Sequence, residues 1–142
     1  MQMELIKRLE HITLRSELDL KSFSEKFITA LGLPQLNYDS ENETEWGNIE
    51  YNGINYNISR PYEEGTLQEW DDTTPIGCNF GITLGITKQN AFADDEECIF
   101  DNLIAKVCNL LATTFNASVY YHRTHIIGTH KNVQRSLTFR PN

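Results

Sequence analysis

The sequence predicts a single α+β domain over residues 1–142, with two helices on one face of a mainly antiparallel sheet. Three observations predict this fold. The length is typical of one domain and allows a substantial core. Two segments carry apolar residues at helical spacing, and several others alternate apolar and polar residues as strands do. The expected order is β-α-β-β-β-α-β-β, which a two-layer arrangement satisfies.

A strand and a helix are predicted at the start of the chain. Residues 9–15 alternate as a strand does. Asp19 is a suitable N-cap for the helix that follows, and Gly32 and Pro34 are typical of its end. The apolar residues of this helix recur at helical spacing, namely Leu20, Phe23, Phe27 and Leu31.

The dipeptide Asn52-Gly53 is the strongest turn signal, because Asn-Gly favours the type I′ turn of a two-residue hairpin. The turn fixes the register of both strands and places an almost wholly apolar set on one face. We expect that face to pack near Phe27 and Val107. Its members are Ile49, Tyr51, Ile54, Tyr56 and Ile58.

The second half of the chain predicts one long helix and three strands. Residues 77–87 alternate strictly, with one apolar face and one face of small residues. Asp94 is the expected N-cap of the second helix, with Glu97 completing a capping-box pattern. Closing strands are predicted at 119–124 and 133–140.

Charge is distributed unevenly along the chain. The net charge is −8, and residues 39–72 hold ten acidic residues against one base, Arg60. Residues 102–142 hold five bases and no acidic residue. This asymmetry bears on partners and association rates rather than on the fold. The net negative charge disfavours a nucleic-acid partner.

We expect a cytoplasmic protein with no cofactor and no membrane contact. Residues 1–8 lack the apolar stretch of a secretory signal, and the apolar runs are too short to cross a bilayer. Three cysteines without CxxC spacing argue against disulfides and zinc, and Cys108 is expected in the core. His122 and His125 would point to opposite faces of a strand, so no metal site is expected there.

The acidic loop predicted at 60–76 provides the candidate binding site. Aromatic side chains are frequent anchors of interfaces, and surrounding carboxylates steer an oppositely charged partner. The alternative is a solvated loop in which Trp70 folds back onto the core. The predicted partner-binding residues are Glu63, Glu64, Glu69, Trp70, Asp71 and Asp72, and no catalytic residue is assigned.

In its acidity and its lack of a clear catalytic motif, the chain resembles bacterial immunity proteins, which neutralise a cognate toxin. The resemblance implies a basic protein partner, such as the nuclease-like domain of a toxin. The acidic surface would mimic phosphate, occupy the basic cleft and exclude the substrate. We therefore expect a binding protein rather than an enzyme.

One alternative is a small enzyme. The tripeptides His11-Ile12-Thr13 and His122-Arg123-Thr124 resemble the paired His-x-Thr motifs of two-histidine phosphoesterases. That resemblance implies one imidazole acting as acid and the other as base on a phosphodiester. We expect instead that His11 and His122 do not form a catalytic pair. The separation of the two imidazoles tests this expectation.

Overall fold

In the computed structural model, the described residues form one antiparallel sheet in the order β2-β3-β4-β5-β1-β6-β7. The structure describes residues 6–71, 73–86, 96–127 and 130–141. The strands are β1 (Ile6–Leu14), β2 (Asn37–Ser40), β3 (Thr44–Tyr51), β4 (Ile54–Pro61), β5 (Phe80–Ile86), β6 (Val119–Ile127) and β7 (His130–Phe139). The helices are α1 (Leu20–Leu31), α2 (Thr66–Trp70) and α3 (Glu96–Phe115).

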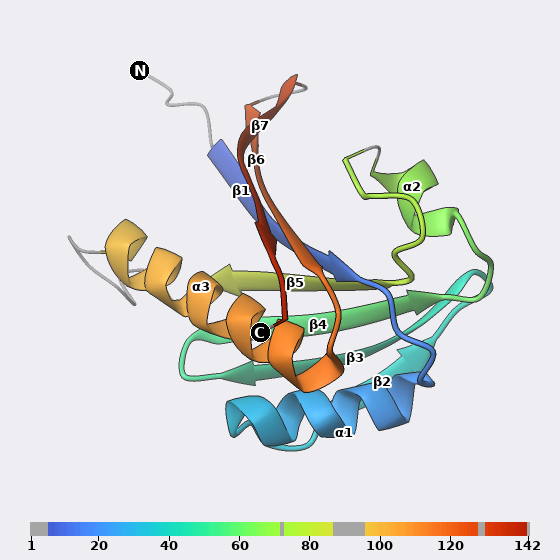
Figure 1. Cartoon of the computed structure of the whole chain (residues 1–142). Coiled ribbons are helices and arrows are strands. Elements are labelled where there is room, and N and C mark those ends of the chain that lie inside the picture. The colour runs from blue at the N-terminus through green and yellow to red at the C-terminus, as the bar shows by residue number, and fades with distance from the viewer. Residues whose placement is uncertain (1–5, 72, 87–95, 128–129, 142) are drawn as a thin grey trace.

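The predicted α+β class is confirmed, with α1 and α3 packed on one face of the sheet (Figure 1). Two short elements were not predicted. The strand β2 has only four residues and no alternating apolar pattern. The helix α2 lies within the stretch predicted as loop, and it is on the opposite side of the sheet from α1 and α3 (Figure 1).

The predicted ends of α1 are confirmed. The side chain of Asp19 accepts a hydrogen bond of 2.7 Å from the backbone N–H of Ser22. Gly32 takes the left-handed conformation, with φ of 68°, that glycine adopts without steric cost. The predicted cap of the second helix, Asp94, lies outside the described residues. That helix is followed by Asn116, whose φ is 49°.

The hairpin register predicted from Asn52-Gly53 is also confirmed. Both turn residues have positive φ, 52° and 80°, as a type I′ turn requires. The cross-strand pairs include Tyr51 with Ile54 and Ile49 with Tyr56. The apolar face of this hairpin packs against the helices. Of the five residues predicted for that face, only Tyr51, beside the turn, is exposed.

The core lies between the sheet and the pair α1 and α3. The ring of Phe23 is stacked between those of Phe80 and Phe115, with centroid separations of 4.0 and 4.2 Å. Cys108 is buried here as predicted, and burial raises the pKa of its thiol to about 12. Within the described part of the chain, no helix combines the length and apolar character needed to cross a membrane.

Candidate partner-binding site

The site lies on the face of the sheet that α1 and α3 leave uncovered. Side chains alternate along each strand, so the neighbours of core residues point to this second face. His11 and Thr13 on β1, Gly81 and Thr83 on β5, and Ser59 on β4 lie there side by side, as the register shows. The chain between β4 and β5, which includes α2, covers part of this face (Figure 1).

The connection between β4 and β5, residues 62–79, is held to the sheet by specific contacts. We call it the β4–β5 segment. Leu67 is buried over Gly81, where an added Cβ would approach the Cδ2 of Leu67 to 3.3 Å, so α2 packs closely on the sheet at this point. The side-chain amide of Gln68 donates to the carbonyls of Pro75 and Cys78, at 2.8 and 3.1 Å. These contacts of Leu67 and Gln68 tie α2 to the sheet and to the chain that leads into β5.

Three large apolar side chains are exposed on this anchored segment. The exposed fractions are 51% for Tyr62, 48% for Trp70 and 97% for Ile76. Trp70 is therefore about half covered by its own domain, and it does not belong to the buried core cluster. The three side chains belong to one segment of the chain, and large exposed aromatic residues are frequent anchors of interfaces.

The predicted carboxylates divide into two groups. Glu63, Glu64 and Glu69 are exposed on the same segment as Trp70, and Glu64 forms an ion pair with Arg15. Asp71 instead turns inward, with 3.9 Å between its Oδ2 and the Nε2 of His11. The sixth predicted residue, Asp72, lies outside the described residues.

Sequence reasoning missed a second acidic segment at the same site. The turn between β2 and β3 lies beside Trp70, and together they line a concavity of about 400 Å³. The backbone N–H of Tyr62 donates to the carbonyl of Glu43 at 3.0 Å, which ties the two segments together. The residues that line this concavity are Glu41, Asn42, Glu43, Thr44 and Trp70. The charge excess over 39–72 was visible in the sequence, but only the strand register brings its two parts together.

Trp70 also lines a second cavity, of about 280 Å³, between the β4–β5 segment and the sheet. Asp71 contributes its carboxylate, and its Oδ1 accepts hydrogen bonds from the backbone and hydroxyl of Thr73, at 3.0 and 2.7 Å. The side chains at its polar wall are His11, Thr13, Ser59, Asp71, Thr74 and Thr83.

His11 and His122 are direct cross-strand partners on β1 and β6. Opposite positions on antiparallel strands share one face, with Cβ atoms roughly 4.5–5.5 Å apart. The two residues nevertheless differ in access. His11 lines the cavity, whereas His122 is only 9% exposed and Thr124 is fully buried. Burial lowers the pKa of His122, and the nearby charge of Asp71 partly opposes that shift.

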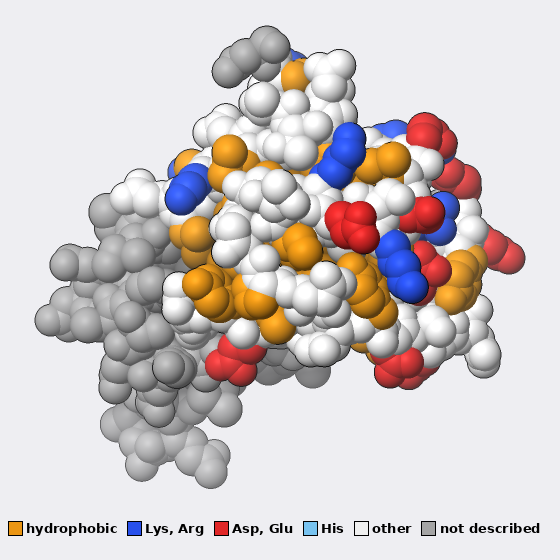
Figure 2. All heavy atoms as spheres, turned by 90° about the horizontal axis from the view of Figure 1, so that it is seen from below, with side chains coloured by type: hydrophobic (Ala, Val, Ile, Leu, Met, Phe, Trp, Pro, Cys, Tyr) orange, Lys and Arg blue, Asp and Glu red, His pale blue; other side chains and the backbone are white. Residues whose placement is uncertain are grey.

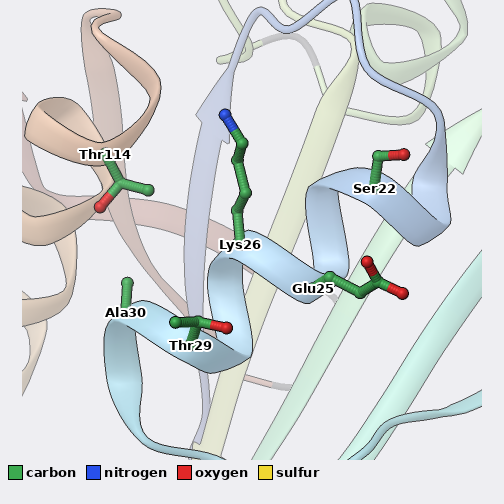
Figure 3. A pocket seen from close by; sticks show the side chains of 6 residues that line it. All are labelled: Ser22, Glu25, Lys26, Thr29, Ala30 and Thr114. Carbon is green, nitrogen blue, oxygen red and sulfur yellow. The ribbon is translucent and has the colours of Figure 1, made fainter.

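Another groove lies elsewhere, between α1 and α3, and has a volume of about 540 Å³ (Figure 3). Its lining includes Glu25 and Lys26, whose charged ends point away from each other (Figure 3). Small uncharged side chains form the remainder. No set of groups converges there on a common point, so we do not assign a function to this groove.

The distribution of acidic side chains on the surface agrees with a binding site near Trp70. Figure 2 shows the helix-covered side of the molecule, where apolar and uncharged polar side chains occupy the centre. Acidic side chains gather toward the end at which the turn between β2 and β3 lies (Figures 1 and 2). Among the described residues, no group of three or more potential ligands could hold a metal ion.

Comparison with known proteins identifies no relative of this chain. No family model, no curated protein and no solved structure matches the chain. The functional conclusion therefore depends on the residues of the site.

Proposed function

We propose that this chain is a cytoplasmic immunity-type protein that binds a basic protein partner, such as the nuclease-like domain of a toxin. The interface is the surface centred on Trp70, which we call the Trp70 surface. Its apolar members are Tyr62, Trp70 and Ile76. Its acidic members are Glu41, Glu43, Glu63, Glu64 and Glu69.

The observation that carries the proposal is the half-exposed indole of Trp70 between two acidic segments. A large aromatic side chain on an anchored segment loses little conformational freedom when a partner covers it, so its burial contributes efficiently to binding. Like charges around it repel one another in the free protein, and a cationic surface would offset that repulsion.

The proposed mechanism is occlusion. The carboxylates of the Trp70 surface take the place of the nucleic-acid phosphates that a nuclease binds, so they dock into its basic cleft. The indole is then desolvated against the partner, and the cleft is closed to substrate. The chain performs no bond-making step in this mechanism.

The test begins with capture of a partner by the tagged protein from its native cell, or with the product of the neighbouring reading frame. Calorimetry then compares the parent with Trp70→Ala and with Tyr51→Ala. Tyr51 is a matched control, because it is an exposed aromatic residue at the turn between β3 and β4. Trp70→Ala should weaken binding by about 2 kcal/mol or more, and Tyr51→Ala should bind like the parent. Parent-like binding by Trp70→Ala would place the interface elsewhere.

A second candidate function, phosphodiester cleavage, is favoured by one observation: His11 and His122 lie opposite each other. It requires both imidazoles to reach one substrate, and the burial of His122 and Thr124 weighs against it. The discriminating assay is turnover of a 2′,3′-cyclic nucleotide by the parent and by His11→Gln. We expect no turnover by either protein. Turnover that is lost in His11→Gln would favour the enzyme over the binding protein.

A further inference from the structure

The cavity between the β4–β5 segment and the sheet is lined mainly by apolar surface. Leu67 and Trp70 of α2 form one wall, and β1, β4 and β5 form the other. Its volume is about 280 Å³. An apolar protein cavity of roughly 150 Å³ is enough to bind benzene, whereas pockets for larger ligands run from roughly 300 to 1,000 Å³. The space therefore suits a single aromatic ring better than a nucleotide.

Two polar side chains at the cavity wall already have partners within the chain. The Oδ1 of Asp71 accepts hydrogen bonds from the backbone and the hydroxyl of Thr73, and its Oδ2 lies 3.9 Å from the Nε2 of His11. The hydroxyl of Thr13 is hydrogen-bonded with the Cys78 thiol. Neither group needs a donor from a ligand, and the charge of Asp71 repels an anion. The wall therefore favours an uncharged, apolar occupant.

Trp70 joins this cavity to the acidic concavity on the same surface. Its side chain lines both spaces and is 48% exposed. The acidic concavity carries Glu41 and Glu43. A group that enters the cavity therefore lies near two further carboxylates, which would attract a cation beside that group. Apolar lining and neighbouring charge together fit a basic partner that presents an aromatic side chain.

We propose that this cavity receives one phenylalanine side chain of the basic partner. The inference rests on the proposed function and names the group that the Trp70 surface recognises. The ring enters between α2 and the sheet and packs against the indole of Trp70 and the side chain of Leu67. A lysine or arginine next to the phenylalanine in the partner's sequence lies over the acidic concavity. Tyrosine fits less well, because its hydroxyl would need a hydrogen-bond partner inside the cavity.

The cavity can be tested without the partner, by titrating the full chain with N-acetyl-phenylalanine amide. Nuclear magnetic resonance follows the His11 imidazole and the Trp70 indole, which both line the cavity. We expect saturable shifts of both signals. N-acetyl-leucine amide should bind about fivefold more weakly, because it lacks the contact between two rings. N-acetyl-glutamine amide should not bind, because its polar group would be buried without a partner.

Thr83→Leu is the most specific variant, because it fills the cavity from β5. Thr83 lies opposite His11 in the sheet and lines the same space. The variant should abolish binding of phenylalanine amide while leaving the midpoint of thermal unfolding unchanged or raised. Thr83→Ser is the matched control, which leaves the cavity open and should bind like the parent. Ser59→Leu fills the cavity from β4 and provides the same test if Thr83→Leu does not fold.

A pair of capped dipeptides tests the neighbouring charge. The phenylalanyl-arginine peptide should bind about threefold more tightly than the phenylalanyl-glutamine peptide at low salt. The difference should vanish near 1 M salt, where the Debye length is about 3 Å. Glu41→Gln with Glu43→Gln should remove the difference without weakening the binding of the uncharged peptide. Equal affinities of the two peptides at low salt would contradict a basic residue beside the phenylalanine.

The outcomes separate this inference from the proposed function. The cavity proposal is wrong if phenylalanine amide causes no saturable shift, or if Thr83→Leu binds it like the parent. Binding of toluene without binding of phenylalanine amide would also overturn it, in favour of a free small molecule. A captured partner that needs Trp70 but binds Thr83→Leu like the parent would leave the proposed function intact and refute the cavity proposal. If phenylalanine fills the cavity but partner binding is unaffected by Trp70→Ala, the proposed interface fails and the cavity remains.

Discussion

Glu10 and Arg123 form a buried ion pair across β1 and β6, with 2.8 Å between Oε1 and Nε. The pair lies on the helix-covered face of the sheet. The hydroxyl of Tyr121 donates to the same carboxylate, which, with burial, raises the pKa of Tyr121. Arg123 also pairs with Asp101 of α3 and thereby joins the sheet to the helix layer. Each buried charge in this cluster has a partner, which is the condition under which a core tolerates ions.

The first prediction concerns this pair. Glu10→Ala should lower the free energy of unfolding by about 3–5 kcal/mol, because it leaves the buried Arg123 with only part of its compensation. Urea denaturation measures the change. Glu64→Ala is the control, since it removes the exposed pair with Arg15 and should leave the midpoint unchanged within error. Equal effects of the two variants would contradict a special role for the buried pair.

The second prediction concerns the hairpin. Ile54→Ala should lower the free energy of unfolding by about 2–5 kcal/mol, because Ile54 is buried against the helices and truncation leaves a cavity. The matched substitution Ile76→Ala removes the same atoms from a side chain that is 97% exposed, and it should leave stability unchanged. A stable Ile54→Ala protein would show that the core relaxes to fill the space.

These elements show what local sequence determines. The Asn52-Gly53 turn and the alternation beside it predicted the hairpin register, because turn chemistry and side-chain patterning depend on neighbouring residues. The pairing of β1 with β6 joins distant parts of the chain, and no local signal specifies it. The opposition of His11 and His122 was therefore beyond sequence reasoning, although both tripeptides were visible.

The candidate site shows the same division. Composition was enough to locate an acidic stretch with Trp70 in it. It could not show that Asp71 turns inward to His11, or that the turn containing Glu43 lies beside Trp70. Both facts follow from the way the β4–β5 segment folds over the sheet. The packing of Leu67 over Gly81 is part of that path, and it exists only in the assembled sheet.

The third prediction concerns pH. Burial lowers the pKa of His122 in the folded protein below its ordinary value of about 6.5. The unfolded chain then binds a proton that the folded protein does not, so stability falls as pH drops below about 6.5 and is fully retained above it. Urea midpoints of the parent and of His122→Gln between pH 8 and 5 test this. The variant should lose less stability on acidification, and identical slopes would contradict the assignment.

The fourth prediction concerns how the proposed partner reaches the Trp70 surface. Exposed carboxylates act mainly by attracting a cationic partner during encounter, so they should affect the association rate more than the dissociation rate. The rate of association should fall as salt is raised, because the Debye length shrinks from about 8 Å at 0.15 M to about 3 Å at 1 M. Stopped-flow fluorescence of Trp70 offers a direct signal, since its burial accompanies binding in the proposed complex.

Two double variants with equal charge loss make that prediction specific to the surface. Glu63→Gln with Glu69→Gln removes two exposed carboxylates from the segment that carries Trp70, whereas Glu25→Gln with Glu50→Gln removes two exposed carboxylates from α1 and from β3 near its turn. A uniform field of the whole protein would make both pairs equivalent. If the field is local, the Glu63→Gln/Glu69→Gln variant should associate with the partner more slowly than the control variant at low salt. The difference should vanish near 1 M salt, because the Debye length is then shorter than the interface. Equal association rates for the two variants at low salt would mean that net charge, rather than the Trp70 surface, attracts the partner.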